Sequence, residues 1–174
     1  MKKILWIALV AVAMFVTSCG NSESKGEATP EGGAENETTS AKYEVYDNAE
    51  MTLSYPKGMK VTYEGLGGMN AANSDGSCKF SATFNATGPT EDQLEMAQKN
   101  HEGMITAGGS EIESSNVDGK IMLIRSKKES QIEVYFLVLG EGTKCISGKI
   151  SYPADSASVY DADIDPIVKA MKVK

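Results

Sequence analysis

The segment Gln131–Leu139 (QIEVYFLVL) restricts the possible folds more than any other part of the chain. Alternate side chains of a β-strand point to opposite faces of the sheet. One face of this segment would carry Ile132, Val134, Phe136 and Val138, and the other Tyr135, Leu137 and Leu139. A strand that is apolar on both faces is covered on both sides. We therefore predict a central strand, with a layer of structure packed on each face of its sheet.

Alternation of apolar and polar residues predicts the other strands in the same way. Two of them flank the central strand, at Lys120–Arg125 and Lys144–Ser151. Earlier strands are expected around Tyr43–Val45, Met51–Tyr55, Met59–Tyr63 and Cys78–Ala86. The strand at Met59–Tyr63 should be half-buried. The stretch Gly65–Ser77 is rich in Gly, Asn and Ser, and we expect it to be a loop.

Two segments have helical spacing instead. The first would begin at Thr90 as N-cap, with Gln93 completing a capping box, and would end at Gly108-Gly109. Its apolar side would be Leu94, Ala97, His101 and Met104/Ile105. The last helix would bury Ile164, Ile167, Val168 and Met171, with Pro166 in its first turn. The result is an α+β fold, an antiparallel β-sheet flanked by helices in an α/β/α sandwich.

These elements fit one domain, residues 42–174, of 133 residues. It contains 14 Lys and Arg against 19 Asp and Glu, a net charge of −5. A nucleic-acid-binding domain usually presents a basic patch, so this balance argues against a nucleic-acid partner.

Three stretches of the domain resemble the PsbP/DcrB-type family: MTLSYPKGMKVTYEG (51–65), the meander Gly119–Pro153, and the closing DIDPIVKAMKV. The resemblance is one of pattern and order, and it implies an α/β/α sandwich with an antiparallel sheet. It also implies a non-enzymatic exported protein that docks on a membrane complex. No ligand motif of the family matches residue by residue, so it implies no cofactor and no metal here.

The N-terminal residues predict export. Lys2 and Lys3 precede a run of 13 apolar residues, Ile4–Val16. A membrane-spanning helix needs about 20 apolar residues, so this run is typical of a removable signal peptide, residues 1–18. The next four residues, Val16-Thr17-Ser18-Cys19, resemble the lipobox of bacterial lipoproteins. That resemblance implies cleavage before Cys19 and attachment of diacylglycerol and a further acyl chain, such as palmitate, at Cys19.

Residues 19–41 would be the lipidated cysteine and a spacer. From Gly20 to Ala41 there is no Val, Ile, Leu, Met or aromatic residue, and there are five Glu and one Lys. Such a segment cannot bury enough apolar surface to fold, so we expect a disordered tether. Gly20 is not the Asp that retains some lipoproteins in the inner membrane, and no compact acidic cluster for surface export follows Cys19. We therefore predict the outer membrane, on its periplasmic side.

Candidate chemistry in the domain is sparse. His101 could serve as a base or ligand, but no second histidine or nucleophile motif accompanies it, so a partly buried core histidine is the simpler interpretation. Asp161, Asp163 and Asp165 imitate half of an EF-hand loop, but Pro166 replaces its glycine. We expect these acids at the N-terminus of the last helix. No catalytic residue, metal ligand or cofactor is predicted.

Two cysteines and one serine remain as candidate modification sites. Export permits a disulfide between Cys78 and Cys145, but the alternation of side chains places the two thiols on opposite faces of a shared sheet, which disfavours it. Asp155-Ser156-Ala157 resembles an O-glycosylation sequence of some anaerobic Gram-negative bacteria, which would make Ser156 the glycan site. Three loosely defined positions also occur by chance.

Two functions are compatible with this sequence. The first is a lipid-anchored binding or assembly module of the cell envelope that docks on a partner protein. The second is a carrier of a small ligand or ion in a pocket between sheet and helices. A closed core with an exposed apolar patch would favour the first, and a cavity of several hundred Å³ with converging polar groups would favour the second.

The lipobox hypothesis predicts the outcome of one substitution. Cys19→Ala removes the thiol that would be acylated, so the variant should no longer incorporate labelled fatty acid and should leave the membrane fraction. Metabolic labelling and cell fractionation measure both. A variant that stays membrane-bound and labelled would contradict the hypothesis.

Overall fold

The computed structural model describes residues 43–174; the segments 1–18 and 19–41, with Cys19, lie outside the described residues. The first half of the domain contains β1 (Tyr43–Asp47), β2 (Met51–Pro56), β3 (Lys60–Gly65), β4 (Gly68–Ala72), β5 (Lys79–Asn85), the short helix η1 (Glu91–Gln93) and α1 (Leu94–Ala107). The second half contains β6 (Glu111–Asp118), β7 (Ile121–Lys128), β8 (Gln131–Leu139), β9 (Cys145–Pro153), η2 (Ala154–Ser156), α2 (Ala157–Lys169) and β10 (Lys172–Val173).

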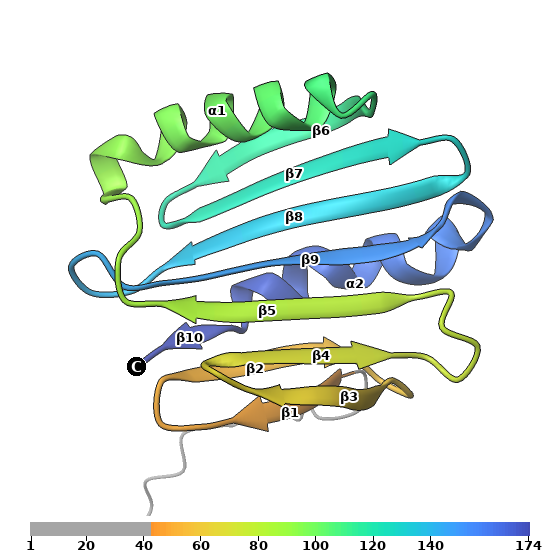
Figure 1. Cartoon of the computed structure of the whole chain (residues 1–174), viewed down its shortest axis with the longest axis horizontal. Coiled ribbons are helices and arrows are strands. Elements are labelled where there is room, and N and C mark those ends of the chain that lie inside the picture. The colour runs from red at the N-terminus through yellow and green to blue at the C-terminus, as the bar shows by residue number, and fades with distance from the viewer. Residues whose placement is uncertain (1–42) are drawn as a thin grey trace, which may run out of the picture. The chain divides into compact units, whose positions relative to one another are not determined.

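The strands form two antiparallel sheets (Figure 1). The larger has seven strands in the order β3-β4-β5-β9-β8-β7-β6, and the smaller has three in the order β1-β2-β10. Helix α1 lies on one face of the large sheet and α2 on the other. The predicted α+β fold, an antiparallel sheet flanked by helices, is confirmed.

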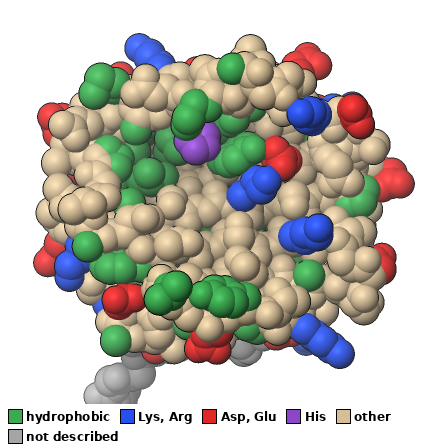
Figure 2. Space-filling model, viewed as in Figure 1, with side chains coloured by type: hydrophobic (Ala, Val, Ile, Leu, Met, Phe, Trp, Pro, Cys, Tyr) green, Lys and Arg blue, Asp and Glu red, His purple; other side chains and the backbone are tan. Residues whose placement is uncertain are grey.

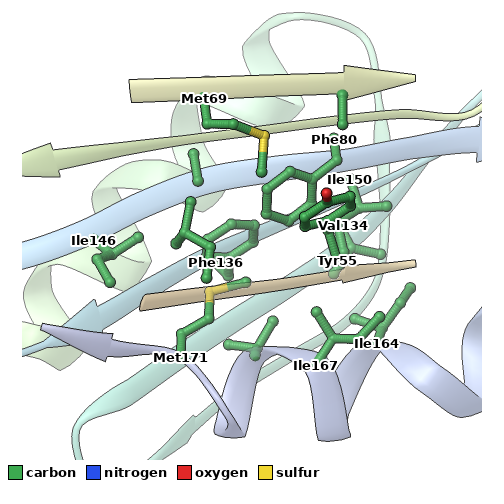
Figure 3. Packing of buried hydrophobic residues seen from close by; sticks show 14 of the residues in the cluster. Tyr55, Met69, Phe80, Val134, Phe136, Ile146, Ile150, Ile164, Ile167 and Met171 are labelled. Carbon is green, nitrogen blue, oxygen red and sulfur yellow. The ribbon is translucent and has the colours of Figure 1, made fainter. Parts of the chain in front are cut away.

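The main hydrophobic core lies between the large sheet and the layer that contains α2 and β2 (Figure 3). β8 contributes its even-numbered residues to this core, and β5 and β9 contribute theirs. Fully buried members are Met51, Leu53, Met69, Phe80, Phe136, Ile146, Ile150, Tyr152, Ile167 and Val168. This side of the sheet is therefore covered along most of its width.

A second, smaller cluster lies under α1 on the opposite face. Its buried members are Leu94, Ile105, Met122, Ile124, Leu139 and Cys145, and Tyr135 and Leu137 pack against it. Helix α1 thus covers β6, β7 and the near side of β8. The two-sided burial predicted for Gln131–Leu139 is confirmed, since β8 contributes to both clusters.

The sequence missed three strands, β4, β6 and the two-residue β10, and misjudged one. β4 lies within Gly65–Ser77, which was expected to be a loop, because only Met69 and Ala71 give it an apolar face. β6 was not predicted, because its sequence EIESSNVD is mainly polar and a bulge between Ile112 and Ser114 interrupts its alternation. The strand expected at Met59–Tyr63 is not half-buried: β3 is an exposed edge strand.

The helices also differ from the prediction in places. Helix α1 ends at Ala107 before Gly108, as expected, and the Thr90 backbone N–H donates to the Gln93 side chain at 3.2 Å. Met104, however, is 63% exposed. The last helix begins about two turns earlier than expected, at Ala157, so Pro166 lies near its end and not in its first turn.

One glycine in the middle of β9 allows the main core to close. Gly148 is the cross-strand partner of Phe136, and a Cβ at this position would overlap the Phe136 ring and the carbonyl oxygen of Ser81. The missing side chain leaves the space that the Phe136 ring fills, stacked with Phe80 at 5.9 Å between ring centroids.

We predict that Gly148→Ala destabilises the domain. The overlap involves backbone as well as a ring, so the free energy of unfolding should fall by about 1–3 kcal/mol or more. Gly103→Ala is the matched control: nothing lies within 4 Å of a Cβ at this position in α1. That change should raise stability by about 0.5–1 kcal/mol, because alanine favours helix over glycine. Urea unfolding of both variants measures the difference, and equal effects would contradict the packing argument.

Candidate functional site

About half of one sheet face has no cover among the described residues. Helix α1 reaches only β6, β7 and β8, and the side chains that β5 and β9 present on that face are polar. On β5 they are Lys79, Ser81, Thr83 and Asn85, and on β9 they include Ser147, Lys149 and Ser151. Figure 2 shows this face, with a hollow between α1 and the β3–β4 hairpin.

Two adjoining hollows occupy the open face. The larger, of about 600 Å³, lies over β4, β5 and β9 and is lined by Thr62, Asn70, Lys79, Ser81, Glu133, Lys149, Ser151 and their neighbours. The smaller, of about 300 Å³, extends under the side of α1 and is lined by Thr83, His101, Met122, Tyr135, Leu137, Ser147 and their neighbours. Ser81 and Lys149 line both. We call the two hollows together the trough.

Strand register fixes the order of groups along the trough. Cross-strand partners share a face and lie about 5 Å apart. One row therefore runs from Asn70 through Ser81 and Lys149 to Tyr135. A parallel row contains Lys79, Ser151 and Glu133. The floor is a grid of short hydroxyl and amide side chains with one charged cluster in its centre.

Glu133 is the centre of that cluster. Its two carboxylate oxygens accept from Lys149 Nζ at 2.6 Å and from the Tyr135 hydroxyl at 2.6 Å. Burial opposes ionisation of Glu133, but these two hydrogen bonds outweigh it and lower its pKa below the ordinary value. Burial and the neighbouring carboxylate raise the pKa of Tyr135, so its hydroxyl stays protonated and donating at neutral pH. The cluster is a fixed, internally neutral group of donors and acceptors.

His101 closes the end of the trough beneath α1. Its ring meets that of Tyr135 edge-on, with 5.1 Å between ring centroids. The side chain is half-buried, as its place on the apolar side of α1 indicates, and burial lowers its pKa, so it is neutral at pH 7. Met122 and Leu137 line the same hollow, which is therefore apolar on this side.

The other candidates from the sequence lie elsewhere. Asp161 and Asp165 lie in the middle and last turns of α2, not at its N-terminus, because the helix begins earlier than expected. Asp161 accepts from Arg125 and from the Tyr152 hydroxyl, and Asp165 pairs with Lys169 at 3.1 Å. Within residues 43–174 no group of three or more metal-binding side chains is found.

The disulfide left open by the sequence is not formed. Cys78 and Cys145 are both buried free thiols, and they belong to the clusters on opposite faces of the sheet. Burial raises the pKa of Cys78 to about 11, so this thiol is unreactive at neutral pH. Ser156 is half-buried in η2 and its hydroxyl donates to Asp155 at 3.1 Å. Its glycosylation stays a prediction.

Sequence reasoning did not find the trough. Ser81, Thr83 and Lys149 each occupy the polar positions of an alternating strand, which is the pattern of any solvent-facing strand. Only the pairing of β5 with β9 brings them together. One sequence feature could have indicated the trough. The segment Lys144–Ser151 is polar on one face, although the strand predicted beside it, Gln131–Leu139, is apolar on both.

The comparisons with known proteins concern the fold. No protein-family model and no curated protein matches the chain. Among solved structures, it is similar to the cyanobacterial PsbP (CyanoP) of Synechocystis sp., with a TM-score of 0.56 and 14% identity over 82% of this chain and 98% of that one. It is similar to the Saccharomyces cerevisiae Ran-binding protein Mog1p to the same degree, with a TM-score of 0.56 and 13% identity over 76% of this chain and 95% of that one. The fold is shared with PsbP and Mog1p. At these identities the likeness shows the fold alone. None of the helices within residues 43–174 is long and apolar enough to span a membrane.

The Glu133 cluster predicts how stability depends on pH. A carboxylate whose pKa is lowered by folding stabilises the folded state above its unfolded pKa, and this contribution is lost as pH falls through the folded value. Unfolding free energy should therefore fall below about pH 4.5, the ordinary value for Glu, and the fall should be smaller in Glu133→Gln. Glu141→Gln, in the exposed β8–β9 turn, should keep the full dependence. Urea unfolding between pH 3 and 7 measures it, and identical curves for all three proteins would refute the assignment.

Proposed function

We propose that this protein is a lipid-anchored, non-enzymatic binding module of the cell envelope, and that it docks on a partner protein through the trough. Cys19 carries the lipid, residues 20–41 separate the domain from the membrane, and the open face of the sheet is left for binding. The observation on which this rests is the hollowed half of the large sheet that residues 43–174 leave uncovered, with its grid of hydrogen-bonding side chains.

The packing of the domain supports binding at the surface over transport in the interior. The main core is filled by large side chains, and among the described residues no buried side-chain nitrogen or oxygen lacks a hydrogen-bond partner. The hollow beside α2, lined by Arg125, Asp161 and Ile164, is about 140 Å³. Cavities that enclose a small organic ligand are usually 300–1,000 Å³. Among these hollows of the described residues, those of the trough on the outside of the sheet give a partner the most room.

The structural neighbours support the same class of function. Mog1p is a Ran-binding protein, so a domain of this fold can serve to bind another protein. The resemblance of the sequence to exported proteins that dock on membrane complexes points the same way. The sequences are only 13–14% identical, so we infer the partner of this protein from its own side chains.

The location follows from the N-terminal sequence. Export by the signal peptide and acylation of Cys19 would hold the domain at a membrane, and two or more acyl chains make such attachment stable. We propose the periplasmic side of the outer membrane, on the residues that follow Cys19. The tether would allow the trough to reach a partner in the same membrane or next to it.

The trough also meets the criterion stated above for a carrier, because its hollows measure several hundred Å³ and polar groups converge on them. This observation favours a second function. The hollow beneath α1 combines the polar Tyr135 and Ser147 with the apolar Met122 and Leu137, at a volume of about 300 Å³. A small ligand with a polar and an apolar side would fit such a surface. This arrangement corresponds to a carrier with its site between sheet and helix.

Photo-cross-linking in living cells tests the docking proposal. A photoreactive phenylalanine analogue replaces Thr83, which is exposed on the trough floor, in the full-length chain. We expect a discrete cross-linked protein of constant size. The matched control carries the analogue at Val159, which is 63% exposed on α2, and should not give that product. Equal products at both positions, or none at Thr83 while a purified small metabolite shifts the melting temperature, would overturn docking and favour the carrier.

A further inference from the structure

The open face is basic although the domain is acidic. Lysines on this face follow from register: Lys60 is the partner of Ala72, which is the partner of Lys79. Lys128 on β7 and Lys149 on β9 point to the same face. Glu133 is the only acidic residue among the strand positions of this face in the described chain. In Figure 2 blue side chains lie over the sheet, whereas most red ones lie at the outline.

Contacts among the described residues neutralise only one of these lysines. Among the described residues, Glu133 forms an ion pair with Lys149 alone, at 2.6 Å, and Lys128 interacts with its charge at longer range. Lys128 donates to the carbonyl oxygen of Gly108 at 2.8 Å, which leaves its charge in place. Within residues 43–174, Lys60 and Lys79 form no ion pair, and both are exposed. Three positive charges are therefore available on this face, with Lys79 in the lining of the trough and Lys60 and Lys128 beside it, in a domain with a net charge of −5.

We infer that the segment bound in the trough is an acidic stretch of polypeptide; this rests on the docking function proposed above. Positively charged lysines on a concave surface attract and orient negatively charged groups. The hydroxyl and amide groups of Ser81, Asn70 and Ser151 would bind the backbone or further polar side chains. Lys60 and Lys79 lie two strands apart, about 10 Å, which an extended segment covers in about three residues. Acidic residues two or three positions apart therefore match the lysines.

The shape and chemistry of the trough separate this partner from other polyanions. A flat bilayer cannot enter a hollow bounded by α1 on one side and the β3–β4 hairpin on the other. Single-stranded nucleic acid is bound by stacking bases on open aromatic rings. The Tyr135 ring is already contacted by Lys149 at 5.5 Å and by His101 at 5.1 Å. Tyr63, the partner of Asn70 and 47% exposed, is then a single open ring on this face of the described sheet, which is too few for successive bases to stack. An acidic peptide needs neither a flat surface nor a stacking platform.

The experiment measures binding of two labelled peptides to the full-length protein by fluorescence anisotropy. The probe is a 12-residue peptide of alternating Glu and Ser, and its counterpart has Gln in place of Glu. We expect binding of the first only, weakened at least fivefold by Lys60→Glu/Lys79→Glu and about twofold by Lys60→Gln/Lys79→Gln. Binding should also weaken as salt rises, because exposed charges are screened.

The control variant changes the net charge by the same amount elsewhere. Lys99 on α1 and Lys172 on β10 are exposed and lie off the trough. Lys99→Glu/Lys172→Glu should leave binding of the acidic peptide within twofold. Equal loss in both double variants would show non-specific attraction and overturn the inference. Tighter, trough-dependent binding of phosphatidylglycerol vesicles or of a 20-nucleotide single strand would also overturn it, as would a trough-dependent dimer in sedimentation velocity.

A second measurement separates this inference from the docking proposal. The same double variants are combined with the photoreactive residue at position 83. The docking proposal and the acidic partner are both supported if the cross-linked protein is lost in Lys60→Glu/Lys79→Glu but not in Lys99→Glu/Lys172→Glu. If the cross-linked protein is still formed in Lys60→Glu/Lys79→Glu, the docking proposal stands and the inference of an acidic partner is overturned. If the acidic peptide binds but no cross-linked protein is found, the preference of the trough for acidic groups stands and the docking proposal is overturned.

Discussion

A change of side-chain character between two neighbouring strands, on one face of the large sheet, determines the rest of this structure. On β8 that face is apolar near α1, at Leu137 and Leu139, whereas Ser147 stands opposite Leu137 on β9. Helix α1 is stabilised by burying the apolar part, at roughly 25 cal/mol per Å² of apolar area. Beyond β8 it would cover hydroxyl groups instead and gain little. The helix therefore covers one end of the sheet, and the trough begins where the apolar surface stops.

The cluster at Glu133 lies on this boundary and keeps the trough ordered. A half-buried carboxylate is costly unless charged or hydrogen-bonded partners satisfy it. Lys149 and the Tyr135 hydroxyl do so from the neighbouring strand and from the same strand. Tyr135 is in turn held by the ring of His101 on α1. The polar floor is thus connected to the packed cluster under the helix, and its central groups are fixed before any partner binds, which reduces the ordering cost of binding.

The sequence predicted the fold wherever one residue pattern was sufficient. The two apolar faces of Gln131–Leu139 were correctly located, and so was the capping box at Thr90, which begins η1 just before α1. It failed where tertiary pairing outweighs local pattern. β4 and β6 are strands because their neighbours supply hydrogen-bond partners, although their own residues are small or polar. The start of α2 is not predicted correctly, because proline is typical of a helix's first turn, whereas this helix accommodates Pro166 near its end.

The candidate site was beyond sequence reasoning for a related reason. Lys60, Lys79 and Lys149 are far apart in the chain, and each alone is an ordinary exposed strand residue. Their common face appears only when the register β3-β4-β5-β9 is known. The overall acidic charge, by contrast, was visible at once and masked the local basic surface. Net charge describes the whole domain, and a binding surface depends on how that charge is distributed.

The edges of the sheet support binding to its face. An exposed edge strand is a template for another strand, and proteins discourage such pairing with bulges and lysines. β3 has both, a bulge between Val61 and Tyr63 and Lys60 at its start. At the other edge, β6 lies beneath α1, and Gln98 of the helix donates to Ser115 of the strand at 2.5 Å. Strand addition is thus discouraged at one edge and hindered at the other. The same lysine that discourages pairing at the edge adds positive charge beside the trough, so one side chain would serve both protection of the sheet and the proposed recognition of a partner.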